Sequence, residues 1–511
     1  MQLRVLSEDD CARIHEATLK VLEKTGIWFQ NCHEAHAVLA GAGCTVESGG
    51  RVLFPPEVVA EALTKVPDRN ELRADFRYLA FARPLGLRQG ETHFGLIGNT
   101  FYIYDHKAGA IRNCLETDTP DKLLVLDMLP NFEYDCCNLF TAAERRLGTS
   151  VRPSYGALDD CVAFLRRYVR GRAVPGRKKL PISTRNCCSE EERLTILGHA
   201  TLEGPAATNT LRTTGFGFPW VNPQSPLQYK PDDGRAIIAA ARSGRDWNMI
   251  SPEVMMGGTG PVTMAGALVQ HNAEVLAGLV LAQLARAGSP FIYGCVTAPM
   301  DLRNAEISQG SFETALFNAA VVQIADRYGL PTRISPGNTS DRTPGPRALT
   351  ETAVGLYIGS AAGGNIITTG LLDSTLMISY EHLVMVDELI NQIHSITGGV
   401  ATDADSLALD AIGGCGHPGG NYLTSEHTAR FLRRDIYYSE FCGRVAASYE
   451  DCYDQAHRRV KEIVERRDTD AHVDKDVLAR LAAVEARLRE DDKTWRQGQE
   501  DWWAFYVQDL H

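Results

Sequence analysis

Short apolar runs alternate with longer helical patterns over most of the chain beyond Cys114, and this alternation constrains the fold more than any other feature. The runs have the length of buried strands and cover residues 132–138, 180–186, 248–254, 291–296, 331–334 and 365–369. Helical patterns separate the later runs, at residues 265–285, 312–328 and 348–361. The last four runs begin between 34 and 43 residues apart, which is the spacing of strand–helix units in a parallel sheet. The alternation therefore predicts an α/β fold.

Clusters of glycine, proline and polar residues follow nearly every predicted strand, as in NCCSEEE, SPEVMMGGTGP, GCVTAPMDLRN, SPGNTSDRTPG and TGLLDS. An open doubly wound sheet concentrates its functional loops at one switch point, whereas a barrel carries a ring of them. We therefore expect a (β/α)8 TIM barrel over residues 115–450. It would be preceded by an N-terminal α+β extension over residues 1–114 and followed by a C-terminal helical tail over residues 451–511.

The two flanking regions have patterns of their own. Ser7 and Asp10 have the spacing of a capping box and Gly26 ends the periodic stretch, so a helix is expected between them. The stretches CTVESGGRVLF and FYIYDHKAGAIRNC predict hairpins, and PPEVVAEALTKVP predicts a short helix between prolines. The tail closes with the aromatic cluster WWAFY, for which packing against the body or a sister subunit is favoured over ligand binding.

Composition excludes several classes of partner. The 511 residues carry 52 basic and 64 acidic side chains, a net charge of −12, which disfavours nucleic acid and anionic membranes. We see no uninterrupted apolar run of the length that spans a bilayer, and the N-terminal stretch lacks the apolar core of a signal peptide. A cytoplasmic location and a homo-oligomer are expected.

The number and spacing of the cysteines favour reduced thiols over disulfides. There are 13 of them, an odd number, and the adjacent pairs Cys136–Cys137 and Cys187–Cys188 do not form C-x-x-C motifs. A zinc site at Cys187 and Cys188 stays open as an alternative, because these residues follow a strand-like run.

The stretch GGTGPVTMAGALVQHNAEVLAG, residues 257–278, leads from a glycine-rich turn into a helix. It lacks both a lysine followed by Ser or Thr and the G-x-G-x-x-G pattern with a later acidic residue, so a phosphate site is disfavoured. Two alternatives remain: a tight strand-to-helix turn, or a loop whose glycines let the backbone approach a large planar group.

Several segments carry a resemblance to a known family. They are GGTGPVTMAGALVQHNAEVLAGLVLAQ, SPFIYGCVTAPMDLRN, SFETALFNAAVVQIADRYGLP, GLLDSTLMISYEHLVMVDE and NYLTSEHTARF. Together they resemble the trimethylamine methyltransferase family of corrinoid-dependent methyltransferases, over roughly residues 5 to 465. The resemblance implies a TIM barrel whose mouth receives a methylated amine while a separate corrinoid protein presents its cobalt there. No cofactor bound tightly by this chain and no metal are expected.

Some members of that family carry pyrrolysine in a loop that corresponds to residues 335–351. Here that loop reads SPGNTSDRTPGPRALTE and contains only standard residues. The chain therefore resembles the non-pyrrolysine members, among which are glycine betaine methyltransferases. A quaternary ammonium needs no activating group because it leaves as a neutral amine, so we expect a betaine-like substrate held in a desolvated pocket.

Candidate site residues follow from loop positions and residue types. Glu253, Asp301 and Asp373 are the candidate catalytic carboxylates, with a structural role, or for Asp301 a salt bridge to Arg303, as the alternative. Arg342 and Arg347 are expected to clamp a substrate carboxylate, unless they are solvated loop arginines. The other candidate substrate-binding residues are Tyr293, His382, Phe218 and Trp220, for each of which packing or a structural role is the alternative. Gly257, Gly258 and Gly260 form the candidate corrinoid-facing loop.

Two rival functions remain open from sequence. One is a zinc-dependent corrinoid or thiol methyltransferase on the same barrel, and the other is a non-catalytic barrel that binds methylated amines.

Overall fold

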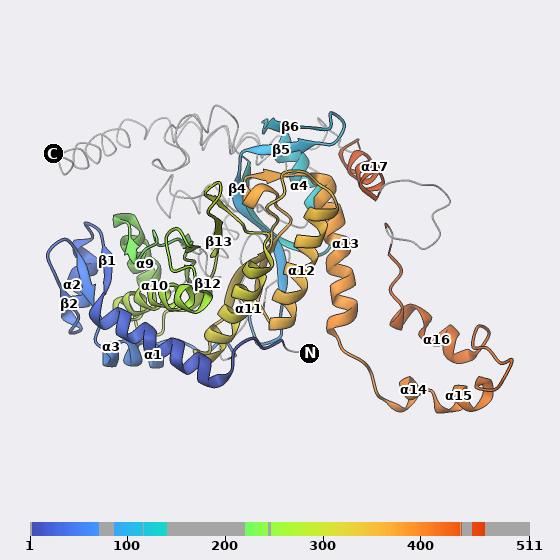
Figure 1. Cartoon of the computed structure of the whole chain (residues 1–511), viewed down its shortest axis with the longest axis horizontal. Coiled ribbons are helices and arrows are strands. Elements are labelled where there is room, and N and C mark those ends of the chain that lie inside the picture. Colours follow the sequence, from blue (N-terminus) through green and yellow to red (C-terminus); the bar gives the residue numbers. More distant parts are fainter. Residues whose placement is uncertain are drawn as a thin grey trace, which may run out of the picture.

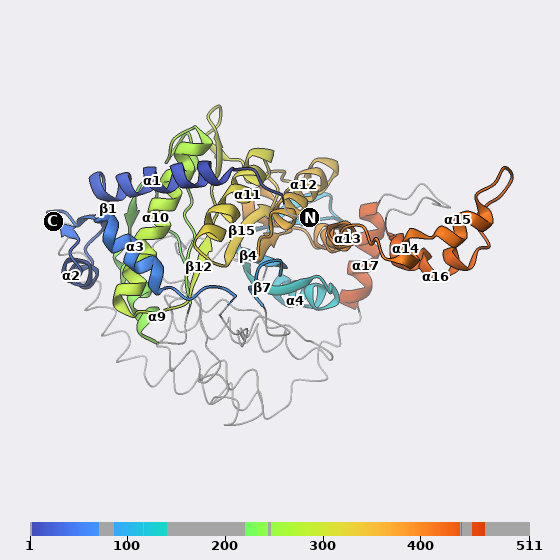
Figure 2. The same cartoon turned by 90° about the horizontal axis from the view of Figure 1, so that it is seen from below.

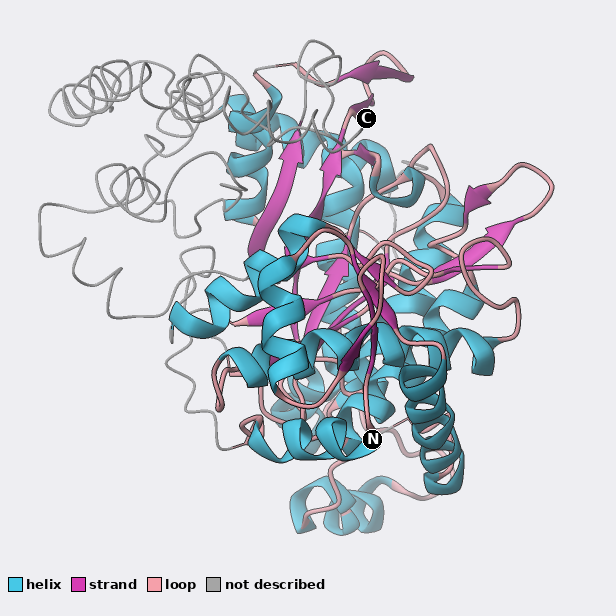
Figure 3. Ribbon diagram, turned by 90° about the vertical axis from the view of Figure 1, so that its left-hand side faces the viewer, coloured by secondary structure: helices cyan, strands magenta, loops and turns pink. Residues whose placement is uncertain are grey.

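The computed structural model describes residues 3–70, 86–115, 117–139, 220–243, 247–439, 441 and 452–465. Within them the chain forms an α/β fold in which helices pack around a central parallel sheet (Figures 1 and 3). The α/β class expected from the alternation of strand and helix patterns is confirmed.

The central sheet has seven strands in the described residues. Its order is β7 (Phe132–Leu139), β4 (His93–Thr100), β16 (Ile366–Thr369), β15 (Thr332–Gly337), β12 (Phe291–Gly294), β10 (Asn248–Ile250) and β8 (Trp220–Val221). Every neighbouring pair is parallel. The described sheet is open between β7 and β8, and no closed barrel is seen in this part of the chain. The predicted strand at 180–186, which falls between these two in sequence, lies outside the described residues.

The sheet begins earlier than the sequence predicts. β4 pairs with β16 on one side and with β7 on the other, although its residues fall inside the range 1–114 assigned to the extension. The predicted boundary at residue 114 is therefore too late, since the sheet already includes His93.

Helices connect the consecutive strands and cover the sheet. They are α4 (Asp118–Met128), α9 (Pro231–Ser243), α10 (Met264–Ala285), α11 (Phe312–Arg327), α12 (Pro346–Ala362) and α13 (Tyr380–Thr397). The helices predicted at 265–285, 312–328 and 348–361 are confirmed, with ends shifted by at most two residues. Helix α12 lies directly on β15. The contact is so close that a Cβ at Gly355 would be 1.7 Å from the carbonyl oxygen of Pro336.

Helix α10 is the central helix of the layer on β10 and β12. By length and composition it is the described helix that could cross a membrane, but most of its residues are buried inside the protein. Its polar residues hold neighbouring elements: Asn272 donates from Nδ2 to Thr18 Oγ1 (3.0 Å) and accepts from the Tyr293 hydroxyl (3.0 Å). Glu274 accepts from Ser225 Oγ (2.8 Å) and the backbone N–H of Leu227 (2.9 Å).

The N-terminal region forms a small sheet and three helices beside α9 and α10. The sheet order is β2 (Thr45–Val46), β3 (Arg51–Leu53), β1 (Ile27–Phe29) and β9 (Gln228–Tyr229), and the helices are α1 (Glu8–Lys24), α2 (His33–Gly41) and α3 (Pro56–Lys65). The predicted capping box is confirmed, since Ser7 and Asp10 exchange both of its hydrogen bonds. Both predicted hairpins and the proline-led helix α3 are also confirmed.

Two further small sheets lie at the carboxyl ends of the central strands. One contains β11 (Met255–Met256), β13 (Ala298–Asp301) and β14 (Glu306–Ile307). The other contains β17 (Met377–Ile378), β5 (Tyr102–Asp105) and β6 (Ala110–Asn113), next to the 3-10 turn η1 (Asp373–Thr375).

The last described helices divide into an arm and a packed helix. Helices α14 (Ala404–Leu407), α15 (Leu409–Cys415) and α16 (Glu426–Asp435) extend away from the body (Figures 1 and 2). Helix α17 (Cys452–Glu465) returns to pack against α13 and α4. The Tyr453 hydroxyl lies 3.1 Å from His382 Nδ1, and His457 Nδ1 lies 2.8 Å from Glu381 Oε1. The rest of the predicted tail, with its aromatic cluster, lies outside the described residues.

Candidate active site

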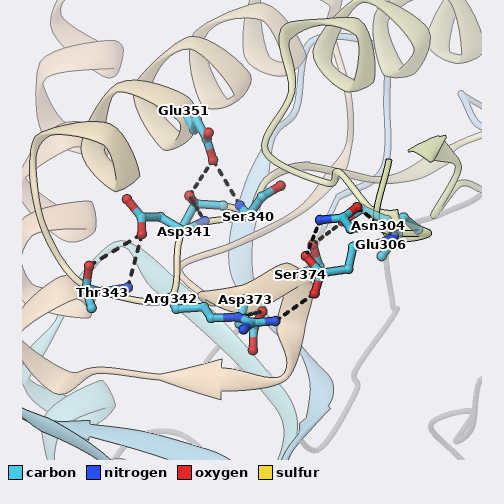
Figure 4. Close-up of polar contacts among 11 residues, drawn as sticks. Asn304, Glu306, Ser340, Asp341, Arg342, Thr343, Glu351, Asp373 and Ser374 are labelled. Carbon is cyan, nitrogen blue, oxygen red and sulfur yellow. Dashed lines mark hydrogen bonds and ion pairs between the residues drawn. The ribbon is translucent and has the colours of Figure 1, made fainter. Parts of the chain in front are cut away.

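Side chains from three loops meet beyond the carboxyl ends of β12, β15 and β16 (Figure 4). Arg342, in the loop after β15, bonds from Nη2 to Glu306 Oε1 (2.9 Å) and from Nε to Asp373 Oδ1 (3.0 Å). The two carboxylates, first Asp373 and then Glu306, raise the pKa of the Arg342 guanidinium. The structure thus brings together two of the predicted site residues, Arg342 and Asp373, and adds Glu306, which the sequence analysis missed.

The turn that carries Asp373 has an unusual backbone. Asp373, Ser374 and Thr375 all have positive φ (49°, 51° and 81°), a region that non-glycine residues rarely occupy. Hydrogen bonds from the neighbouring loops hold them there: Asp373 N donates to Asp341 O (2.8 Å) and Ser374 Oγ to Ile307 O (2.9 Å). The position of the Asp373 carboxylate is therefore set by the surrounding loops and not by local preference.

Arg347 is paired with a carboxylate as well. Its Nε donates to Glu351 Oε1 (2.9 Å), one turn further along α12. Glu351 also accepts from Thr339 Oγ1 (2.5 Å) and Ser340 N (2.9 Å), so it fixes the start of the loop after β15 (Figure 4). An open pocket of about 470 Å³ lies here, between the first turns of α11 and α12, lined by Gly310, Ser311, Phe312, Glu313, Pro346, Arg347, Thr350 and Glu351.

The two other predicted catalytic carboxylates lie on neighbouring loops. Asp301 accepts from Arg303 Nη2 (2.6 Å) and Nε (2.9 Å), and these hydrogen bonds lower its pKa to about 2. This is the salt bridge that the sequence left open. Glu253 is exposed after β10 and accepts a hydrogen bond from Asn222 Nδ2.

Tyr293 and His382 do not join this group. Tyr293 is fully buried, and its hydroxyl donates to Asn272 on α10, so its side chain lies between the sheet and the helices. His382 is also fully buried; it contacts Tyr453 on α17, and burial lowers its pKa to about 4. For both residues the structure shows the packed alternative. Phe218 lies outside the described residues, and for Trp220 only the backbone, at the start of β8, is described.

The glycine loop after β11 is a compact turn. Gly257 N donates to Gly260 O (3.0 Å), and Gly258 N donates to Met255 O (2.9 Å). Gly257 has φ +89°, which glycine adopts readily, and a Cβ at Gly260 would be 2.3 Å from Val254 Cγ1. Close packing within the turn thus accounts for these glycines. The tips of Val262 and Leu302, 71% and 67% exposed, flank Gly257.

Acidic residues outnumber arginines in these loops. The carboxylates are Glu253, Asp301, Glu306, Asp341, Glu351 and Asp373, and the arginines are Arg303, Arg342 and Arg347. A surface with this balance attracts cations. Glu306, Asp341 and Glu351 were missed because their sequence context resembles that of ordinary surface carboxylates; their positions after parallel strands were the available signal.

In the part of the chain that the structure describes, no group of three or more His, Cys, Asp or Glu side chains is arranged to hold a metal ion. Cys187 and Cys188, the alternative zinc ligands, lie outside that part.

The model of the trimethylamine methyltransferase family matches residues 1–130 and 202–491. The chain belongs to this family. It is 29% identical, over 86% of its length and 87% of the relative's, to a glycine betaine methyltransferase from Desulfitobacterium hafniense. It is 26% identical to a trimethylamine methyltransferase from Methanosarcina barkeri, over 97% of both chains. These findings confirm the resemblance and support an enzyme of the methyltransferase type.

Among solved structures, the chain is similar to the monomethylamine methyltransferase of Methanosarcina barkeri. The TM-score is 0.43 at 12% identity, over 89% of this chain and 92% of that one.

Proposed function

We propose that this chain transfers a methyl group from a quaternary amine, betaine-like in structure, to the Co(I) of a corrinoid carried by a separate protein. The observation that carries the proposal is the meeting of Glu306, Arg342 and Asp373 from three loops at the carboxyl ends of the strands. We call these loops the mouth, and in them carboxylates outnumber arginines. Such a mouth favours a cationic substrate over an anionic or neutral one. We further propose that the described strands belong to a closed (β/α)8 barrel.

The chemistry of the leaving group favours a quaternary amine. A quaternary ammonium departs as a neutral amine, whereas a neutral tertiary amine would need prior protonation or covalent activation. The loop at residues 335–351 contains only standard residues, so it offers no pyrrolysine for such activation. The work left to the protein is to desolvate the cation and to hold one N–CH₃ bond toward the acceptor.

The carboxylates at the mouth suit the cationic end of the substrate. Asp301, with its pKa lowered to about 2, is ionised at neutral pH. Asp373 is held in place by its loop contacts and by Arg342. Because the carboxylates of these loops outnumber their arginines, the net charge near the carboxyl ends of the strands is negative and favours a cation.

The corrinoid of the partner protein would approach the exposed side of the same loops. The corrinoid supplies the nucleophile that accepts the methyl group. Val262 and Leu302 form an exposed apolar pair beside Gly257, which a partner protein docked on these loops would cover. Gly257, Val262 and Leu302 would face the corrinoid protein, and the compact glycine turn would place them.

The rival functions make different demands. A zinc-dependent methyltransferase would carry stoichiometric metal through purification, which metal analysis detects. A non-catalytic binding barrel would bind a betaine without turnover. Cytoplasmic location and homo-oligomeric assembly stay predictions.

A thermal-shift series with glycine betaine, choline and trimethylamine tests the substrate class. A ligand at 100 times its Kd adds about 2.7 kcal/mol of apparent stability, so the expected result is the largest rise in Tm with betaine. No shift with any methylated amine, or a larger shift with trimethylamine, would contradict the proposal.

A further inference from the structure

The central sheet has one face that packs on the helices and an opposite, inner face. Near the carboxyl ends of the strands, Ile250, Ile334 and Ile367 point toward the helices, since Cβ atoms placed at Gly278 of α10 or Gly359 of α12 would meet them at 3.0–3.4 Å. Side chains alternate along a strand. The residues next to these isoleucines therefore point to the opposite, inner face.

The inner face carries a row of small and polar residues across four neighbouring strands. Ser251 follows β10, Gly294 ends β12, Arg333 and Ser335 lie on β15, and Thr368 lies on β16. Gly294 is in register with Arg333, and Ile334 with Ile367, so these positions are adjacent. A Cβ at Gly294 would be 1.8 Å from Ser251 Oγ, which places that hydroxyl against the glycine.

This composition departs from what fills the inside of a parallel sheet or barrel. Bulky branched apolar residues dominate such layers. Here Ser251, Arg333, Ser335 and Thr368 are all at most 2% exposed. The row is therefore a polar layer inside the protein.

All three hydroxyls in the row lack a hydrogen-bond partner among the described residues: Ser251 Oγ, Ser335 Oγ and Thr368 Oγ1. Asn338, just beyond β15, uses Oδ1 to accept from Leu371 N (3.2 Å), while its Nδ2 has no partner in the same residues. Burying a polar group without a partner costs about 1–3 kcal/mol, and such groups in a native protein call for a functional explanation.

Arg333 adds a positive charge to the row. Its Nη1 donates to the carbonyl oxygen of Cys295 (3.2 Å), immediately beyond the carboxyl end of β12. A guanidinium has five N–H donors in a planar fork that matches a carboxylate. The row thus combines one cationic group with hydroxyl and amide donors.

We propose that this row binds the anionic group of the substrate, a carboxylate, with Arg333 supplying the charge and Ser251, Ser335 and Thr368 supplying hydrogen bonds. The inference rests on the proposed function and makes its substrate specific: an amino acid betaine whose carboxylate lies on the inner face of the sheet. The row is an alternative to the carboxylate clamp predicted at Arg342 and Arg347.

The charges on the molecule give such a substrate one orientation. Its carboxylate faces Arg333 inside the sheet, and its ammonium faces the acidic loops of Asp301, Glu306 and Asp373 at the mouth. The methyl groups then point outward, where a partner protein approaches. A substrate bound the other way round would place each charge against its like.

The test compares two adjacent threonines on opposite faces. Thr368→Val removes a hydroxyl from the row, and Thr369→Val removes one that donates to Gly337 O (2.8 Å) on the other face. For Thr368→Val we expect an unchanged or higher Tm of the free protein and about ten-fold weaker binding of glycine betaine, measured by calorimetric titration. Choline, which lacks the carboxylate, should bind as before. Thr369→Val should lower the Tm and leave the ratio of the affinities for betaine and choline unchanged.

Ser335→Ala and Arg333→Lys extend the comparison. Ser335→Ala should behave as Thr368→Val does, and Arg333→Lys should weaken betaine binding by ten-fold or more, because an ammonium cannot replace the fork. The row is not a carboxylate site if Thr368→Val and Ser335→Ala bind betaine as the wild type does. The same conclusion follows if their affinity for choline falls as much as their affinity for betaine. That result would leave the proposed methyl transfer standing, whereas absence of turnover with every methylated amine would remove it.

Discussion

For single side chains such as Arg342, the sequence predicts the position in the fold but not the partner. The sequence places this arginine in the right loop, but its guanidinium is already paired with Glu306 and Asp373. The sequence leaves Tyr293 open as a candidate for cation binding beside the core packing that the structure shows. β12 is buried on both faces, so its apolar pattern does not reveal which residues point to the helices. Side-chain direction was the missing information, and it also hid the row at Arg333.

For Arg342→Ala we expect little change in the affinity for glycine betaine. The side chain is 58% exposed, and exposed ion pairs contribute about 0–1 kcal/mol, so the Tm should fall only slightly. Calorimetric titration with betaine and choline measures the effect. A ten-fold loss of affinity for betaine but not for choline would instead support Arg342 as the residue that binds the substrate carboxylate.

His382 predicts an acid-dependent loss of stability. Burial lowers its pKa to about 4, below the ordinary value of about 6.5. A group whose folded-state pKa is depressed contributes stability that is complete above pH 6.5 and declines as the pH falls toward 4. The unfolded state binds the proton first in that window, at a cost of about 2 kcal/mol at pH 5.

Urea unfolding at pH 7.5 and pH 5 measures this loss, with His382→Gln as the comparison. The variant should lose less stability between the two pH values than the wild type. His271, also fully buried and with its pKa lowered to about 3, contributes a loss of the same sign, so part of the slope should remain. Equal slopes in the two proteins would contradict the assignment to His382.

At the scale of helices and strands, the 3.6-residue and apolar-run patterns predicted most of the described elements. β4 was missed because HFGLIGNT contains two glycines, which are rare in strands. Both have a packing reason: a Cβ at Gly95 would be 2.4 Å from Tyr134 O, and one at Gly98 would be 2.8 Å from Leu371 Cδ1. Contacts made in three dimensions therefore overrode local propensity.

The contact of α12 with β15 gives a prediction at this scale. Gly355→Ala would place a methyl group 1.7 Å from Pro336 O, so the helix must move away from the strand at a cost of about 3 kcal/mol. Gly41→Ala in α2 is the control, because nothing lies within 4 Å of its Cβ position. Denaturant unfolding should show a large loss for the first variant, and no loss or a gain of up to about 1 kcal/mol for the second. Comparable stabilities for the two variants would disprove the close contact.

For the whole molecule, the spacing of strands predicted a parallel α/β sheet, and the resemblance of its loops predicted the family. The start of the sheet was misplaced, since β4 precedes the predicted boundary at residue 114. Closure into a barrel depends on strand pairing across residues far apart in sequence, which patterns along the chain do not report. The acidic mouth is likewise a property of loops that only the fold brings together.

The most direct test of the proposed function is methyl transfer from glycine betaine to Co(I) cobalamin by the purified chain, followed by the visible spectrum of the cobalamin. The expected result is methylcobalamin and dimethylglycine in equal amounts, with no activity on trimethylamine and no need for added zinc or nicotinamide. Thr368→Val should raise the betaine concentration needed for half-maximal rate, while Thr369→Val should not. Failure to form methylcobalamin from any methylated amine, or faster transfer from trimethylamine than from betaine, would contradict the assignment.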